Sequence, residues 1–195
     1  MKLREGIVEV YTGSGKGKTT AAFGLAFRAS GWGLKSLIVQ FMKMGRYGEN
    51  ISSRKMPDTI EVRYVGKPYF IAWEEDIPLA DREKVKNVRL YPRGHPPQDY
   101  VDMANKLMDN TVEEMNEGKW DIIILDEINV AIYYRLIELK RVIELIESKP
   151  RHVELVFTGR NVDPEIISRA SLVTEMVEIK HPYQQGILAR KGIDF

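Results

Sequence analysis

The chain has 195 residues, which is enough for one α/β domain with a sizeable core, and we expect a single domain over 1–195. Its 29 lysines and arginines nearly balance 28 aspartates and glutamates, and the net charge of +1 gives no electrostatic case for binding nucleic acid or an anionic membrane. The chain has no cysteine, which excludes disulfides, thiolate catalysis, iron–sulfur clusters and cysteine zinc sites.

The N-terminal residues lead directly into a first predicted strand over 6–12 and leave no room for a signal peptide. The sequence contains no run of about 18 apolar residues, so we expect no membrane span. Together these observations predict a cytoplasmic protein.

A glycine-rich segment, 12–20, follows this strand and precedes a helical pattern over 21–28. The order strand, Gly-rich turn, Gly-Lys-Thr and helix is the context of a phosphate-binding P-loop. Glycines let backbone N–H groups converge on a polyphosphate, Lys18 supplies a positive charge, and the Thr19 hydroxyl can bind Mg²⁺. The predicted nucleotide-binding residues of this segment are Gly13, Ser14, Gly15, Lys16, Gly17, Lys18, Thr19 and Thr20.

The glycine spacing differs from the usual P-loop pattern. That pattern has a glycine five positions before Gly17, where this chain has Thr12. Gly13 and Gly15 are shifted inward, and Lys16 adds a second cation. We therefore expect the phosphates to lie differently from those in a kinase or a GTPase. The alternative is a glycine-rich turn that only joins a strand to a helix.

The region that follows alternates apolar runs with loops. A helix stop at 30–33 precedes predicted strands over 35–41 and 59–65, with a loop over 42–57 that is either solvated surface or a cover for a ligand. Residues 66–76 are predicted to form a loop, because proline and glycine interrupt its start. Its aromatic residues either pack onto the core or form a platform for a large flat ligand. A short helix is predicted over 79–90 and a long one from 97 or 98 to 117.

A second informative segment is the apolar run over 120–126, which ends in Asp126 and Glu127. A buried parallel strand presents such carboxylates at its C-terminal end, where ligands of α/β sheets bind, and one of them can hold Mg²⁺. The alternative is an acidic cap at the start of the next helix.

The remaining pattern completes an α/β alternation. Helices are predicted over 129–134, 138–148 and 164–170, strands over 152–158 and 172–180, and a basic tail follows. Arg160, just beyond a strand end, is a natural partner for phosphate oxygens. The six predicted strands and their helices indicate a doubly wound, mostly parallel sheet.

Several of these segments together resemble the P-loop type of ATP:corrinoid adenosyltransferase. The resemblance rests on 13–20, 39–41, 124–127, 158–161, 172–176, 180–182, 186–187 and 191–195, in that order along nearly the whole chain. It implies a RecA-like α/β fold and a homodimer. It also implies transfer of the 5′-deoxyadenosyl group of ATP to the Co(I) centre of a reduced corrinoid, with release of tripolyphosphate, in the biosynthesis or salvage of adenosylcobalamin.

The resemblance also implies roles for individual residues. Lys18 and Lys16 would be the catalytic groups that neutralise the leaving triphosphate. Thr19 and Glu127 would bind Mg²⁺ directly, with Asp126 acting through water. In the family the nucleotide lies reversed in the loop relative to kinases, which agrees with the altered glycine spacing.

For the corrinoid, the resemblance points to an aromatic pair that displaces the lower ligand of cobalt. Phe70 and Trp73 lie in the corresponding segment, although their spacing departs from the expected phenylalanine-x-tryptophan. Electrons for the corrinoid would come from a partner such as a flavoprotein reductase, because the chain has no cysteine. The alternatives are a RecA-like ATPase, a nucleoside kinase, or a non-catalytic protein that delivers a corrinoid or nucleotide to another enzyme.

Overall fold

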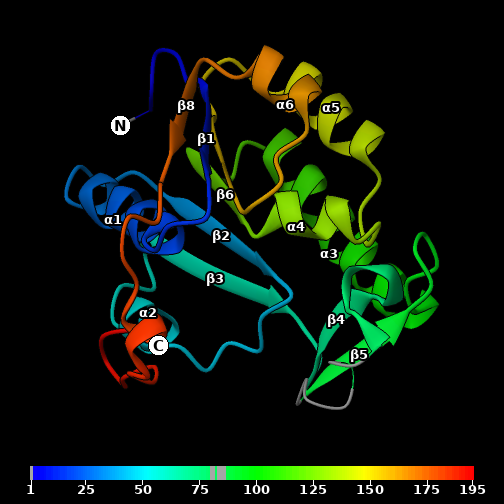
Figure 1. Cartoon of the computed structure of the whole chain (residues 1–195). Helices are drawn as coiled ribbons and strands as arrows, with labels where there is room; N and C mark the ends of the chain where they lie inside the picture. The colour runs from blue at the N-terminus through cyan, green and yellow to red at the C-terminus, as the bar shows by residue number, and fades with distance from the viewer. Residues whose placement is uncertain (1, 80–81, 83–86) are drawn as a thin grey trace.

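The central sheet has six strands, and every neighbouring pair in it is parallel. The structure is a computed structural model that describes residues 2–79, 82 and 87–195. The six strands are β1 (Val8–Thr12), β2 (Ser36–Phe41), β3 (Ile60–Val65), β6 (Ile122–Asp126), β7 (Glu154–Thr158) and β8 (Leu172–Glu175). They lie in the order β3-β2-β6-β7-β1-β8 (Figure 1). The sequence predicts these six strands, and the doubly wound α/β architecture is confirmed.

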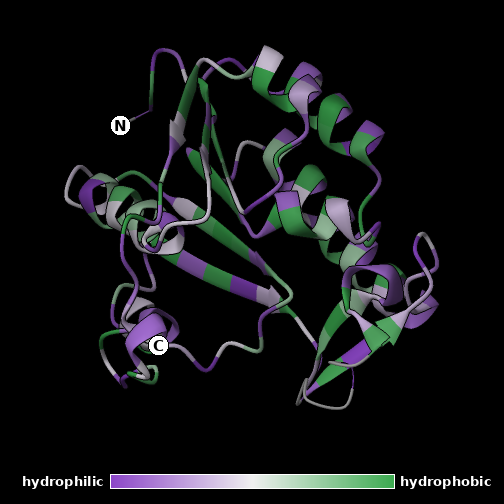
Figure 2. Ribbon diagram, in the orientation of Figure 1, coloured by the Kyte–Doolittle hydropathy of each residue, from purple (hydrophilic) through white to green (hydrophobic). Residues whose placement is uncertain are grey.

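Helices cover both faces of this sheet, which is why its central strands are continuous apolar runs. Helix α1 (Lys18–Ser30) packs on one face, and α3 (Gln98–Asn116), α4 (Ile128–Tyr133), α5 (Leu139–Ser148) and α6 (Pro164–Arg169) pack on the other. All residues of β2, β6 and β7 are buried. Strand β3, at the edge, instead alternates hydrophobic and hydrophilic residues (Figure 2). Among the described residues, no helix has the length and apolar character needed to span a membrane.

A second, two-stranded sheet corrects two of the sequence predictions. Phe70–Trp73 is strand β4 and not part of a loop, and it pairs in parallel with β5, Val88–Tyr91. The helix predicted over 79–90 therefore does not extend to its end; residues 80–81 and 83–86 lie outside the described residues. Aromatic and β-branched residues favour strands once a partner strand is available, and the partner here comes from elsewhere in the chain.

Two smaller differences affect the site. The predicted loop over 42–57 contains a short helix, α2 (Gly48–Ser53). The last strand ends at Glu175 and not near residue 180, because the chain then turns onto the glycine-rich segment. There Gly15 donates a backbone hydrogen bond of 2.6 Å to the carbonyl of Met176.

Candidate active site

Four neighbouring strands of the central sheet carry a polar residue at or next to their C-terminal ends, at the same edge. Gln40 on β2 pairs in register with Asp126 on β6, and Thr158 on β7 pairs with Tyr11, next to Thr12 at the end of β1. Because carboxyl ends of parallel strands share one edge, residues far apart in sequence meet there. The glycine-rich loop leaves β1 at this edge.

The inward-shifted glycines of that loop have a structural cause. A Cβ on Gly13 would lie 2.4 Å from the Met176 carbonyl oxygen, and one on Gly15 would lie 2.7 Å from it. Gly13 and Gly17 also have positive φ angles, 95° and 119°. Glycine is required here because the segment after β8 packs directly against the loop. The sequence gives no local signal for that contact.

Lys18 is folded into the loop that precedes it. Its Nζ donates hydrogen bonds of 2.8 Å to the carbonyls of Gly13 and Gly15, and the side chain is almost fully buried. Burial is the main cause that lowers the pKa of Lys18, and the Glu127 carboxylate opposes it. The loop thus holds a desolvated ammonium at its centre, as a phosphate-binding site needs.

Asp126 lies at the centre of a buried network of hydrogen bonds and is fully inaccessible to solvent. Its Oδ1 accepts from Thr19 Oγ1 at 2.9 Å and from Thr158 Oγ1 at 2.6 Å. Its Oδ2 accepts from Gln40 Nε2 at 3.0 Å and from Lys43 Nζ at 2.7 Å. Burial alone would raise the pKa of Asp126, but the Lys43 ammonium and these hydrogen bonds outweigh it and hold the pKa below its usual value. Both oxygens of Asp126 are therefore already engaged.

The carboxylate of Glu127, the next residue, has different surroundings from that of Asp126. Its backbone is left-handed (φ 61°), and its N–H donates to Thr158 Oγ1 at 2.9 Å. Its side chain lines the cavity beside the loop, and among the described residues no hydrogen bond or ion pair reaches its carboxylate. Burial, followed by the neighbouring Asp126 charge, raises the pKa of Glu127. Of the two predicted carboxylates, Glu127 is the one that can accept an incoming cation.

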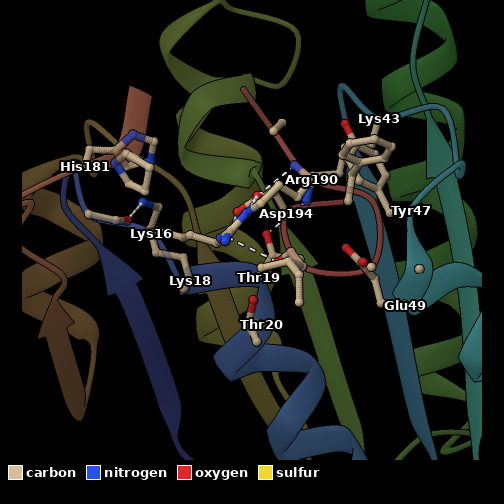
Figure 3. Close-up of a pocket in the computed structure, with 18 of the residues that line it drawn as sticks. Lys16, Lys18, Thr19, Thr20, Lys43, Tyr47, Glu49, His181, Arg190 and Asp194 are labelled. Carbon is tan, nitrogen blue, oxygen red and sulfur yellow. Dashed lines mark hydrogen bonds and ion pairs between the residues drawn. The ribbon is translucent and has the colours of Figure 1, made fainter. Parts of the chain in front are cut away.

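The cavity beside the loop has a volume of about 950 Å³ and is covered by the C-terminal tail (Figure 3). Lys16 leaves the loop towards that tail, where its Nζ pairs with the Asp194 carboxylate and bonds the carbonyl of Ile193 at 3.2 Å. The charge of Lys16 is thus engaged by the tail, whereas Arg160 bonds the carbonyl of Ser14 at 3.1 Å. The structure brings the predicted nucleotide-binding residues together on one cavity; those that line it are Ser14, Gly15, Lys16, Gly17, Lys18, Thr19, Thr20 and Arg160, and Gly13 bonds Lys18 beneath them.

A second cavity, of about 470 Å³, adjoins the first. Phe70 lines it and is 60% exposed, whereas Trp73 is 2% exposed and packs its ring 5.3 Å from that of Tyr134. Of the two predicted aromatic residues, Phe70 therefore faces this cavity, whereas the ring of Trp73 is buried in the protein interior. Both cavities are lined by Lys43, Tyr47, Ala189, Asp194 and Phe195.

Comparison with known sequences agrees with this geometry. The sequence model of the family described as ATP:corrinoid adenosyltransferase BtuR/CobO/CobP matches residues 4–195. The chain belongs to this family. Corrinoid adenosyltransferases from a Sinorhizobium species and Pseudomonas aeruginosa are both 32% identical to it, over 194 residues (98% of this chain, 81% of that protein) and 191 residues (97% and 84%). The corrinoid adenosyltransferase CobA of Salmonella typhimurium is 30% identical over 190 residues (97% and 86%).

The donor set of this adenosyltransferase family member fits a magnesium ion that arrives with a nucleotide. Mg²⁺ in nucleotide sites takes oxygen ligands, often one or two carboxylates together with phosphates. The Thr19 hydroxyl and the Glu127 carboxylate offer such oxygens on the cavity wall. No group of three or more histidines, cysteines, aspartates or glutamates suited to a metal occurs among the described residues, so a metal cage built from the protein alone is not found there.

Sequence reasoning missed three side chains that contact Asp126: Gln40, Lys43 and Thr158. Each stands at or just past the end of a predicted strand. The argument that singled out Arg160, a polar side chain beyond a strand end at the ligand edge, would have found them. The tail contributed to the family resemblance, but no local pattern indicated that residues 187–195 contact the loop, because the two segments lie at opposite ends of the chain.

Proposed function

We propose that this protein transfers the 5′-deoxyadenosyl group of ATP to the Co(I) centre of a reduced corrinoid and releases tripolyphosphate. The observation that carries the proposal is the pair of adjoining cavities, one built on the P-loop and one walled by Phe70, which share the five lining residues named above. A polyphosphate suits the first cavity, and a large flat cofactor suits the second. Membership of the adenosyltransferase family supports the same reading.

The reaction needs little proton transfer from the protein. The Co(I) electron pair attacks C5′ of the ribose, the C5′–O bond breaks, and the triphosphate leaves with the bonding electrons. The nucleophile carries no proton, so no general base is required. The task of the protein is to align the two substrates and to neutralise the leaving group.

The P-loop residues are suited to that neutralisation. Lys18, already desolvated within the loop, would turn from the carbonyls of Gly13 and Gly15 to the phosphates. Lys16 would exchange the Asp194 carboxylate for a phosphate oxygen. Thr19 and Glu127 would hold Mg²⁺, which supplies further positive charge to the triphosphate when bound.

The second cavity separates the roles of Phe70 and Trp73. Replacement of Phe70 by alanine is expected to raise the KM for the corrinoid about tenfold. Burial of the exposed Phe70 ring against the corrinoid contributes roughly 1.5 kcal/mol to the binding free energy, and the alanine variant loses this contribution.

Replacement of Trp73 by alanine is expected instead to lower the free energy of unfolding by about 3–5 kcal/mol, because the Trp73 ring fills the core. Steady-state kinetics and thermal unfolding of both variants measure these effects; Phe70→Ala with unaltered turnover and KM would remove Phe70 from the corrinoid site.

Other features follow from the family resemblance. The proposal includes a homodimer, a cytoplasmic location, a flavoprotein reductase as electron donor, and a place in adenosylcobalamin biosynthesis or salvage. Size-exclusion chromatography with light scattering tests the dimer.

The deciding experiment is an anaerobic assay with ATP, Mg²⁺ and chemically reduced cobalamin. It follows the loss of the Co(I) absorbance and identifies the phosphate product. Adenosylcobalamin together with intact tripolyphosphate is the expected result. ADP and phosphate without a Co–C bond would make the protein an ordinary ATPase, ADP with a phosphorylated acceptor would make it a kinase, and binding without turnover would make it a carrier.

A further inference from the structure

Lys43 is a charged residue at the site that the proposed chemistry does not use. Its Nζ bridges the glycine-rich loop and the end of β6, donating to Thr19 Oγ1 at 2.9 Å and to Asp126 Oδ2 at 2.7 Å. The side chain is 13% exposed, and its ammonium also lies 5.3 Å from the centre of the Tyr47 ring. The cation therefore lies between the predicted metal-binding hydroxyl and the buried carboxylate beside it.

The fold fixes the backbone of Lys43 at some conformational cost. Met42, which precedes it, has a left-handed backbone with φ 58°, an unfavourable conformation for a residue with a side chain. On the other side, a Cβ on Gly66 would lie 2.3 Å from the Lys43 carbonyl oxygen, so only glycine lets the segment after β3 pack there. Unfavourable backbone geometry of this kind persists where the surrounding structure holds a residue in place.

The charge of Lys43 has a consequence for metal binding. Asp126 would otherwise offer a carboxylate next to Thr19 and Glu127, and these oxygens together would attract a divalent cation without a nucleotide. An ammonium between Thr19 and Asp126 neutralises that carboxylate and repels a second cation. Glu127, which has no such partner among the described residues, stays available.

We propose that Lys43 is a positioning residue whose ammonium acts as a resident cation between Thr19 and Asp126, so that a divalent cation binds through Thr19 and Glu127 only when a nucleotide brings it. Lys43 acts on the reaction through these residues and does not itself bind the metal. The inference rests on the proposed function in one respect, namely that this site binds a nucleotide together with a metal ion.

The test measures binding of Mn²⁺ to the nucleotide-free protein by electron paramagnetic resonance of the free ion. Wild type is expected to bind Mn²⁺ weakly, and Lys43→Met is expected to bind it at least about tenfold more tightly, because a positive charge beside the oxygens is lost. Lys43→Arg should behave as wild type. The double variant Lys43→Met/Asp126→Asn should lose the gain, since the second carboxylate is removed. Lys140→Met, which removes a lysine on the exposed face of α5, is the matched control and should change nothing.

Equal Mn²⁺ affinity of folded Lys43→Met and wild type would overturn the inference, as would a gain that survives in the double variant. If Lys43→Met does not fold, Lys43→Gln, which keeps an amide donor, takes its place. If neither Lys43→Met nor Lys43→Gln folds but Lys43→Arg does, the ion pair of Lys43 has only a structural role, and the inference is also overturned. Because these measurements contain no nucleotide, they are independent of the proposed function, which would fail separately if wild type did not bind ATP in the presence of Mn²⁺.

Discussion

Replacement of Lys18 by methionine is expected to lower the rate of adenosyl transfer about 10³-fold, comparable to the loss of one strong preorganised donor at a developing negative charge. The methionine side chain has nearly the same length but no charge. Lys18 is the ammonium that the loop buries, with both of its hydrogen bonds made to loop carbonyls. In the proposed reaction a buried charge would interact more strongly with the leaving triphosphate than an exposed one, because little water screens it.

Lys16→Met is the matched comparison, since it removes the same charge from the same loop. Lys16 is about half exposed and paired with Asp194, so its loss should lower the rate only about tenfold and the effect should weaken as salt is added. The anaerobic assay measures both rates, with thermal unfolding to confirm that the variants are folded. Equal losses in the two variants, or a Lys18→Met enzyme that retains more than about a tenth of the wild-type rate, would contradict this division of roles.

The sequence could predict the central sheet because its strands are buried on both faces. Strands such as β2 and β6 are continuous apolar runs, and helices such as α3 show apolar residues at helical spacing. The placement of the glycine-rich loop and the Asp126–Glu127 pair at one edge of the sheet could be predicted for a related reason. Their chemistry follows from residue type and from position at a strand end, which are both local properties of the sequence.

The features that could not be predicted depend on contacts between distant parts of the chain. Strand β4 forms because β5 pairs with it, and neither segment has a strong pattern by itself. Lys43 and Asp126 are 83 positions apart, and Lys16 and Asp194 are 178 apart. Local propensity carries no information about such partners, so the contact of Lys43 with Asp126 and the contact of the tail with the loop emerge only from the structure.

The glycine pattern of the loop illustrates this limit. The sequence alone links the positions of Gly13 and Gly15 to the way the phosphates lie. The structure gives them a second reason, the packing of Met176 against both residues. The two explanations are compatible, because a loop that packs on the segment after β8 can still direct its N–H groups to a ligand. They differ in the effect that they predict for replacement of a loop glycine on the free energy of unfolding without a ligand.

Gly13→Ala is expected to lower the free energy of unfolding of the nucleotide-free protein by about 3 kcal/mol, the sum of a left-handed backbone and a crowded methyl group. Gly13 has φ 95°, and its Cβ would meet the backbone oxygen of Met176 at 2.4 Å, an atom that cannot move without shifting the chain after β8. For a domain of this size the midpoint of thermal unfolding should fall by roughly 6–12 °C, measured by circular dichroism without ATP or Mg²⁺.

Gly24→Ala provides the matched control, because it adds the same methyl group where the structure has space. Gly24 lies within α1, and no atom outside that helix and its chain neighbours would come within 4 Å of its Cβ. Alanine is the better helix former, so this variant should be more stable by about 0.5–1 kcal/mol. A Gly13→Ala protein as stable as wild type but unable to bind ATP would show that the glycine serves the phosphates alone. A large loss of stability without nucleotide, with the opposite sign in Gly24→Ala, would instead establish that the contact with the segment after β8 determines the glycine spacing of this loop.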